Sequence, residues 1–301
     1  MAHVHHFTYG LITLVLAYAV SVLGCLLGLI CTARARETAR IVWRVRWLAL
    51  GAVSIGGTGI WLMHFLAMLG FTVSNTFVFY DPALTALSAL MAVGIVAVGI
   101  FVVGLGRPSM LKVLVGGVVT GLGVAGMHFT GMAAMQVLDG VVEYDPVLVA
   151  LSVGIAVVAA TVALWFTIVI KSRPALAAAS PIMAIAVSGM HYTGMFAASV
   201  REVAGRGRVE GVDVTTLLIP SAVIVGTVLI ALLYATLSAP AAEERAAEAL
   251  MARLLQDCNE QQPPPAARPT RATMRTHLRH VVTDREDSAP ERKPGSAFVP
   301  R

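Results

Sequence analysis

Long apolar stretches alternate with short polar loops along most of the chain. Seven of these stretches are about 20 residues long or longer, and they contain almost no Asp, Glu, Lys or Arg. A helix of about 20 residues crosses a hydrocarbon core and satisfies its backbone polar groups within its own segment. The pattern therefore predicts an all-α membrane protein with seven transmembrane helices, at residues 9–31, 47–70, 82–106, 112–135, 146–170, 175–199 and 215–237.

The composition agrees with a chain whose main solvent is lipid. Of 301 residues, 57% are hydrophobic and 13% are charged, whereas soluble domains have about 25% charged residues. The N-terminus has no basic region of the kind found in cleaved signals, so we expect the first helix to stay in the membrane. Three parts follow: an outer N-terminus at 1–8 with His3, His5 and His6, a membrane domain at 9–237, and a tail at 238–301 with a short helix followed by disorder.

The basic residues of the loops predict the orientation of the chain. The first loop carries Arg34, Arg36, Arg40, Arg44 and Arg46, the third and fifth loops carry further Lys and Arg, and the second and fourth carry none. The sixth loop departs from this pattern, because it holds three Arg together with acidic residues. By the positive-inside rule the N-terminus lies outside and the C-terminus in the cytoplasm of a cell-membrane protein. The net charge of +5 is explained by the cytoplasmic leaflet and does not indicate nucleic-acid binding.

An internal repeat marks the candidate site. The segments WLMHFLAM, GMHFTGMAAM and GMHYTGMFAA end the second, fourth and sixth spans, and they place His64, His128 and His191 at intervals of 64 and 63 residues. Each repeat contains two crossings, so the membrane domain consists of an N-terminal helix and three two-helix repeats. All three histidines therefore lie at one side, at a common depth near the outer face. Tyr80-Asp81-Pro82 and Tyr144-Asp145-Pro146 open the third and fifth spans as helix caps.

The residues around each histidine suggest a soft metal ion. A Met lies four residues after each His, on the same face of the helix, and another Met immediately precedes it on the flank. Imidazole and thioether without thiolate or carboxylate suit copper, above all Cu(I), better than zinc, magnesium or calcium. The sequence predicts one or two copper ions, with nine candidate ligands: Met63, His64, Met68, Met127, His128, Met132, Met190, His191 and Met195.

Other interpretations of the same residues compete with this one. Each histidine alone could be a packing residue, since Met and His also fill membrane interiors. The set could serve a copper or soft-metal transporter, or two of the histidines could be axial ligands of a haem. No nucleophile, acid–base pair or phosphate-binding loop is present in the sequence, so we do not expect an enzyme. Gly24 with Gly28, and Gly117 with Gly121, have GxxxG spacing, for which packing within the bundle is the favoured reading over dimerisation.

The repeated motif resembles that of the bacterial MHYT domain, an integral membrane sensor family named after Met-His-Tyr-Thr. Met190-His191-Tyr192-Thr193 matches letter for letter, the second copy has Phe129 in place of Tyr, and the first has Phe65 and Leu66. The resemblance covers about residues 5–237. It implies a copper centre near the outer face, built from the Met-His pairs of the three motifs, and a role in sensing oxygen, carbon monoxide or nitric oxide.

The resemblance also raises the question of output. Members of the family are often fused to cytoplasmic domains that make and break cyclic di-GMP. The tail after residue 237 has about 60 residues, too few for such a domain. We therefore expect the signal to pass through an unidentified cytoplasmic partner or through movement of the tail.

Overall fold

The computed structural model describes residues 4–5, 10–73, 78–107, 109–138, 140–203, 211–238 and 250–257. The chain divides into two units, Met1–Ala239 and Pro240–Arg301. In the second unit, residues 250–257 form a helix, within the segment where the sequence predicts one. The remainder of the predicted tail, as well as His3 and His6, lies outside the described residues.

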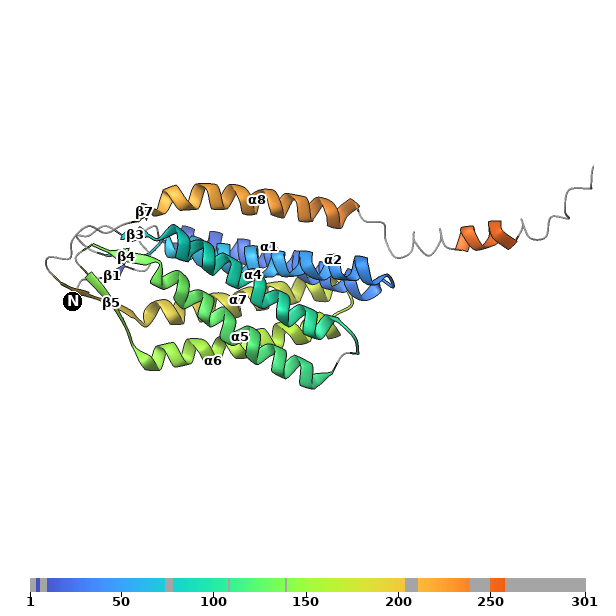
Figure 1. The fold of residues 1–301 in the computed structure, drawn as a ribbon, viewed down its shortest axis with the longest axis horizontal. Coiled ribbons are helices and arrows are strands. Elements are labelled where there is room, and N and C mark those ends of the chain that lie inside the picture. The colour runs from blue at the N-terminus through green and yellow to red at the C-terminus, as the bar shows by residue number, and fades with distance from the viewer. Residues whose placement is uncertain are drawn as a thin grey trace, which may run out of the picture. The chain divides into compact units, whose positions relative to one another are not determined.

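Seven helices of the first unit are long and apolar enough to cross a membrane, as the sequence predicts. Six of them are α1 (Leu11–Glu37), α4 (Pro82–Gly104), α5 (Met110–Ala133), α6 (Pro146–Val169), α7 (Arg173–Phe196) and α8 (Val214–Ser238). The second span is composite, since α2 (Ile41–Ala52) continues through the π-helix η1 (Val53–Leu62) into α3 (Met63–Met68). The multi-pass, all-α fold is thus confirmed (Figure 1).

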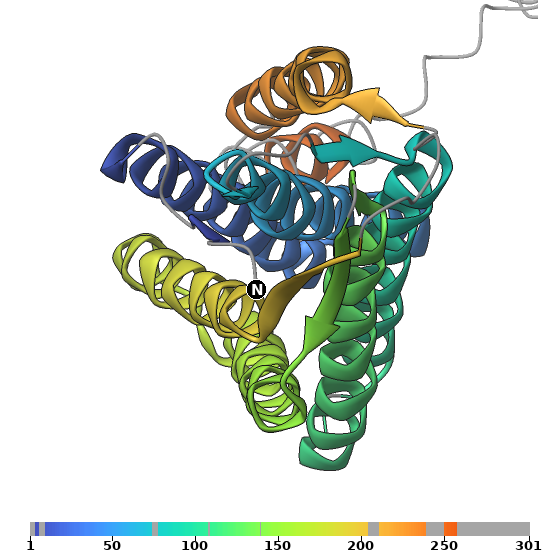
Figure 2. The same ribbon diagram turned by 90° about the vertical axis from the view of Figure 1, so that its left-hand side faces the viewer.

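Three segments carry the repeat histidines. These are η1 with its continuation α3, then α5, and then α7. Their neighbours connect them, since α4 packs against η1 and α5, α6 packs against α5 and α7, and α1 packs against α7 and η1. The helix α8 lies against α1, η1 and the strand region instead (Figures 1 and 2). The N-terminal helix therefore occupies the position that the repeat assigns to the second helix of the third repeat.

Glycines permit the closest approaches between these helices. A Cβ added to Gly24 of α1 would lie 2.4 Å from the backbone nitrogen of Gly59 in η1. A Cβ added to Gly121 of α5 would lie 2.4 Å from Cα of Val157 in α6. Both GxxxG segments are therefore used for packing inside the bundle, as the sequence favours.

Short antiparallel strands cover one end of the bundle, which the sequence did not predict. They form three small sheets with the orders β1-β2, β4-β3-β7 and β5-β6. Register pairs include Tyr80 with Met135 and Tyr144 with Ala198. The strands are β1 (Val4–His5), β2 (Thr72–Val73), β3 (Val78–Tyr80), β4 (Met135–Val137), β5 (Gly140–Tyr144), β6 (Ala198–Glu202) and β7 (Val212–Asp213).

The Tyr-Asp-Pro segments cap helices at this end. The Asp81 carboxylate accepts hydrogen bonds from the backbone of Ala83 and Leu84, and Asp145 accepts the equivalent pair at α6. The backbone N–H of Asp81 also donates to the carbonyl of Ala134 at the end of α5, and that of Asp145 to Ala197 at the end of α7. The predicted caps are thus confirmed, and each one also ties its repeat to the next.

Most of the predicted first loop is helical, and arginines at the end of α1 and the start of α2 bind helix ends at the opposite end of the bundle. The Arg36 guanidinium donates to the carbonyls of Ile168 and Ile170 at the end of α6. Arg44 donates to Gly104 at the end of α4, and Arg34 donates to Thr236 near the end of α8. Cations favour helix C-termini because the last carbonyls carry partial negative charge without intrahelical partners. These arginines thus hold the ends of three other helices.

Candidate metal centre

The three repeat histidines meet in the interior of the bundle. His64 extends from α3, His128 from α5 and His191 from α7. The Nδ1 atom of His64 lies 2.9 Å from Nδ1 of His191 and 3.1 Å from Nδ1 of His128. The ring centroids are 4.9 to 5.1 Å apart, and the rings stand nearly perpendicular to one another. The sequence interval of 64 and 63 residues therefore corresponds to convergence in space.

All three imidazoles are sealed from solvent. His128 is 0% exposed, and His64 and His191 are each 1% exposed. His64 lies four residues before the last residue of its helix and the other two lie five residues before theirs, so all three are within two turns of the strand-covered end. A buried polar side chain needs a partner, because water cannot replace one here.

The protein alone does not satisfy these imidazoles. A neutral imidazole nitrogen has either one N–H or one lone pair. The Nδ1 atom of His64 therefore cannot form good hydrogen bonds with both of its neighbours at once. The three Nε2 atoms on the other side of the rings have no protein hydrogen-bond partner. A cation bound by the three Nδ1 atoms would relieve the conflict between them, because every Nδ1 lone pair could then point at the ion.

Glycines in the motifs make room for the rings. A Cβ on Gly131 would lie 2.5 Å from Nε2 of His64, and a Cβ on Gly194 would lie 2.3 Å from Nε2 of His128. Both glycines follow a repeat histidine by three residues, so each repeat supplies the space for the imidazole of the preceding repeat. In the first motif this position is Ala67. The function of these glycines was not predicted, although their fixed distance from the histidines is a signal visible in the sequence.

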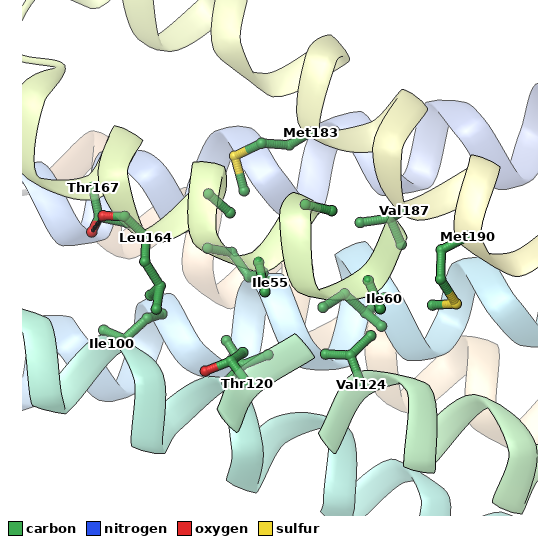
Figure 3. Close-up of a pocket in the computed structure, with 15 residues that line it drawn as sticks. Ile55, Ile60, Ile100, Thr120, Val124, Leu164, Thr167, Met183, Val187 and Met190 are labelled. Carbon is green, nitrogen blue, oxygen red and sulfur yellow. Dashed lines mark hydrogen bonds between the residues drawn. The ribbon is translucent and has the colours of Figure 1, made fainter. Parts of the chain in front are cut away.

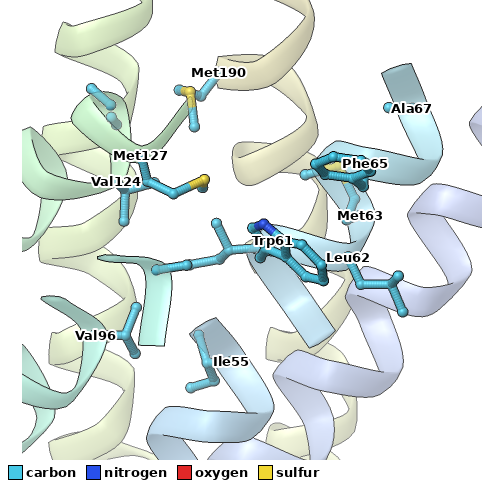
Figure 4. Close-up of a cluster of buried hydrophobic side chains, with 14 of the residues drawn as sticks. Ile55, Trp61, Leu62, Met63, Phe65, Ala67, Val96, Val124, Met127 and Met190 are labelled. Atoms are coloured by element: carbon cyan, nitrogen blue, oxygen red, sulfur yellow. The ribbon is translucent and has the colours of Figure 1, made fainter. Parts of the chain in front are cut away.

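The six candidate methionines are buried around the same helices. Met63, Met127 and Met132 are 0% exposed, and the other three are at most 2% exposed. Met127 and Met190 extend from their helices into the interior, where they belong to the apolar cluster with Trp61 and Val124 (Figure 4). The helical spacing places Met68, Met132 and Met195 on the faces of their histidines. Their sulfurs remain predicted ligands.

The donor set fits copper better than a hard cation. Among the described residues, His64, His128 and His191 are the one group of three or more His, Cys, Asp or Glu that could share an ion. Three neutral imidazoles with thioethers nearby are soft and intermediate donors, which copper prefers, whereas calcium and magnesium need oxygen ligands. The Nε2 atoms have no hydrogen-bond partner in the described part of the chain, and the Nδ1 atoms contact one another. Imidazole nitrogens of this cluster are therefore free to act as metal ligands.

The remaining motif positions have structural roles. The hydroxyls of Thr130 and Thr193 donate to the carbonyls of Gly126 and Gly189 in their own helices, away from the cluster. In the first repeat this position is Leu66, whose side chain cannot form such a bond.

The aromatic residue after the histidine packs against the tyrosine of the Tyr-Asp-Pro segment. The ring centroids of Phe65 and Tyr80 are 5.8 Å apart, as are those of Phe129 and Tyr144. Helix capping accounts for the aspartate and the proline of that segment, and the aromatic contact accounts for the tyrosine.

Comparisons with known proteins agree with this architecture. Residues 57–117 and 121–180 match the MHYT family, described as a bacterial signalling protein N terminal repeat. These segments contain His64 and His128, and the third motif follows them. No solved structure matches the chain.

Several relatives are known signalling proteins. The chain is 38% identical over 223 residues to the bifunctional diguanylate cyclase/cyclic di-GMP phosphodiesterase MucR of Pseudomonas aeruginosa, over 70% of this chain and 31% of that protein. It is 38% identical over 157 residues to the cyclic di-GMP phosphodiesterase NbdA of the same organism, over 50% of this chain and 20% of that protein. It is also 32% identical over 161 residues to the signaling protein YkoW of Bacillus subtilis, over 51% of this chain and 20% of that protein.

The match thus spans less than a third of each of these relatives. The family repeats, at residues 57–117 and 121–180, lie in the membrane-spanning part of this chain. The chain therefore belongs to the MHYT family of membrane-embedded sensor domains in bacterial signalling proteins.

Proposed function

We propose that His64, His128 and His191 bind a copper ion, and that the occupied centre senses oxygen, carbon monoxide or nitric oxide. The observation that carries the proposal is the contact of three buried Nδ1 atoms from three helices, 2.9 and 3.1 Å apart, within rings whose other nitrogens have no partner. Copper bound by such ligands supplies one-electron and oxygen chemistry that no amino-acid side chain offers. The sequence allows one or two ions, and we expect one of them at the histidine cluster.

The residues of this chain set the conditions of that centre. Three neutral imidazoles bring no negative charge, and the buried methionines add soft donors, so the site favours the singly charged Cu(I) ion over a doubly charged one. The glycines behind His64 and His128 hold the rings in place with little freedom to turn. The strands at the end of the bundle and the aromatic pairs keep bulk water from the cluster.

The two alternative functions fit the geometry less well. A transported ion needs polar groups along its path, but the interior beyond Met190 is lined by Ile55, Ile60 and Val124 among other apolar residues. A haem with two axial histidines needs a macrocycle between the two nitrogens. Nδ1 contacts of 2.9 and 3.1 Å leave no space for one.

The output of the sensor is proposed to reach a cytoplasmic partner. Two relatives have names that specify the synthesis or breakdown of cyclic di-GMP, so an enzyme of that kind is the partner class that the family suggests. The arginines that bind the ends of α4, α6 and α8 then lie at the cytoplasmic face, in agreement with the positive-inside rule. The N-terminus is accordingly outside. An alkaline phosphatase fusion after residue 238 should be inactive, and a fusion in the second loop should be active.

Infrared spectroscopy of the carbon monoxide adduct tests the proposed function. We expect the copper-loaded full chain, prepared without a His tag, to show a carbon monoxide stretching band that is absent from the metal-free protein. The His128→Ala variant should lack the band, because it loses one of three ligands. A Gly189→Ala variant serves as the control, since a Cβ there meets no atom within 4 Å. A band of equal intensity in His128→Ala would overturn the proposal.

A further inference from the structure

An apolar cavity lies inside the bundle, between the three histidine-bearing helices and their neighbours. It has a volume of about 60 Å³ and is lined by residues of η1, α4, α5, α6 and α7 (Figure 3). Its lining includes Ile55, Ile60, Val124, Val187 and Met190. Met190 directly precedes His191 in α7, so the cavity ends next to the histidine cluster.

The two hydroxyl-bearing residues of the lining do not make the cavity polar. The Thr167 hydroxyl donates to the carbonyl of Leu164, 2.6 Å away. The Thr120 hydroxyl has no hydrogen-bond partner among the described residues, but its oxygen lies 2.2 Å from the position that a Cβ on Gly99 would take, so it faces α4. In Figure 3 this oxygen points away from Val124 and Ile60. A water molecule needs two to four polar partners, whereas an apolar cavity stays dry and accepts xenon or other small apolar molecules.

The cavity also borders the outer surface of the bundle. Ala159 and Met183 line it together with a second, larger depression between α6 and α7. The rim of that depression includes Leu151, Val158 and Ile182, which are 53%, 64% and 54% exposed on faces that meet lipid. Met183 is itself only 5% exposed, and a methionine side chain is flexible enough to move aside.

We infer that the cavity binds a small apolar molecule of diatomic size, which enters from the bilayer past Met183 and Ala159 and reaches the histidines past Met190. Such molecules leave water for hydrocarbon, so the bilayer is the phase in which they concentrate. The use of the cavity for sensing rests on the proposed function, but the binding itself does not, because the cavity is formed without a metal. Met183 and Met190 lie seven residues apart in α7, and both line the cavity.

Xenon is the probe for the binding step. Xenon-129 NMR of the metal-free full chain in detergent should show saturable binding with increasing xenon pressure. Ala160→Leu fills the cavity and should weaken this binding by about tenfold or more, and the smaller Ala160→Val should weaken it less. Ala150→Leu adds the same carbons to the outer depression on the same helix, which Ala150 lines without lining the cavity, and should leave xenon binding unchanged.

A second readout separates this inference from the proposed function. In copper-loaded protein, Ala160→Leu should slow carbon monoxide binding several-fold while the copper content stays at the wild-type level. Xenon binding without any copper binding would contradict the proposed function and leave the cavity intact as a site. Absence of saturable xenon binding in the wild type, or equal binding in Ala160→Leu, would overturn the cavity inference. Unchanged carbon monoxide kinetics in Ala160→Leu would overturn the route.

Discussion

Gly194 faces the imidazole of His128 so closely that a Cβ at residue 194 would lie 2.3 Å from Nε2. Gly194→Ala should therefore displace the ring without removing a ligand. Overpacking of this kind costs about 1–3 kcal/mol of stability, and disturbing the support of a metal ligand lowers affinity by about 10–100-fold. Copper titration and chemical unfolding of the purified protein measure the two effects.

The matched control for this substitution is Gly189→Ala in the same helix. A Cβ at residue 189 meets nothing within 4 Å, and Ala is a better helix former than Gly by about 1 kcal/mol. We expect unchanged copper affinity and equal or slightly higher stability. If Gly189→Ala and Gly194→Ala lowered copper affinity equally, the proposed role of the glycine would be wrong.

Copper should stabilise the folded chain through the histidine cluster. A ligand present at about 100 times its dissociation constant adds about 2.7 kcal/mol to the free energy of unfolding. His64 joins both Nδ1 contacts, so His64→Ala should lose this gain entirely. Thermal unfolding with and without Cu(I) measures it, and Mg²⁺ is the control because it prefers oxygen ligands. A copper-dependent shift that survived in His64→Ala would place the ion elsewhere.

Tyr80 should make the protein sensitive to alkaline conditions. Burial, and secondarily the negative charge of Asp213, raise the pKa of Tyr80 above its ordinary value of 10. The unfolded chain releases this proton first, so the stability contribution is complete below pH 10 and is lost as the pH rises above it. Melting temperatures between pH 9 and pH 11 should therefore fall less in Tyr80→Phe than in the wild type.

Tyr144→Phe provides the comparison for Tyr80→Phe. The pKa of Tyr144 is also raised by burial, but its side chain is 37% exposed, whereas Tyr80 is 2% exposed. Its effect on the alkaline transition should be the smaller of the two. The opposite ranking would show that burial does not control this transition.

The Arg36 guanidinium should anchor the end of α6. Its hydrogen bonds to Ile168 and Ile170 satisfy carbonyls that the helix leaves open. Hydrogen bonds to charged groups contribute about 1.5–3 kcal/mol, so Arg36→Ala should lower the free energy of unfolding in detergent by an amount of that order. Arg40→Ala, at the exposed residue just before α2, should change it little. Equal losses in both variants would indicate a general effect of charge.

Much of the membrane domain follows from patterns that are local in the sequence. The hydropathy of a span depends only on the residues of that span, so the seven spans were predictable. The caps at Asp81 and Asp145 depend on adjacent residues and were predictable for the same reason. The repeat also predicts that the histidines lie together. Each interval contains two membrane crossings, so the motif returns to the same side and depth of the membrane.

Other features depend on relationships between distant segments, which one sequence does not display. The helix α1 packs between α7 and η1, where the repeat would place α8. This packing depends on the close fit of Gly24 against Gly59 of η1, and a single sequence does not show how two helix surfaces fit. The π-helix before Met63 has no sequence signal that distinguishes it from the α-helix at the equivalent position of α5. The strands have only two to five residues, too few for an alternating pattern to appear.

The content of bound metal tests the central claim most directly. The full chain, expressed with copper and purified without a His tag, should contain about one copper per molecule by mass spectrometry. A variant with Ala at His64, His128 and His191 should contain none while remaining folded. Copper retained in that variant, or no copper in a wild type that is folded and supplemented, would contradict the assignment of the histidine cluster as the metal centre.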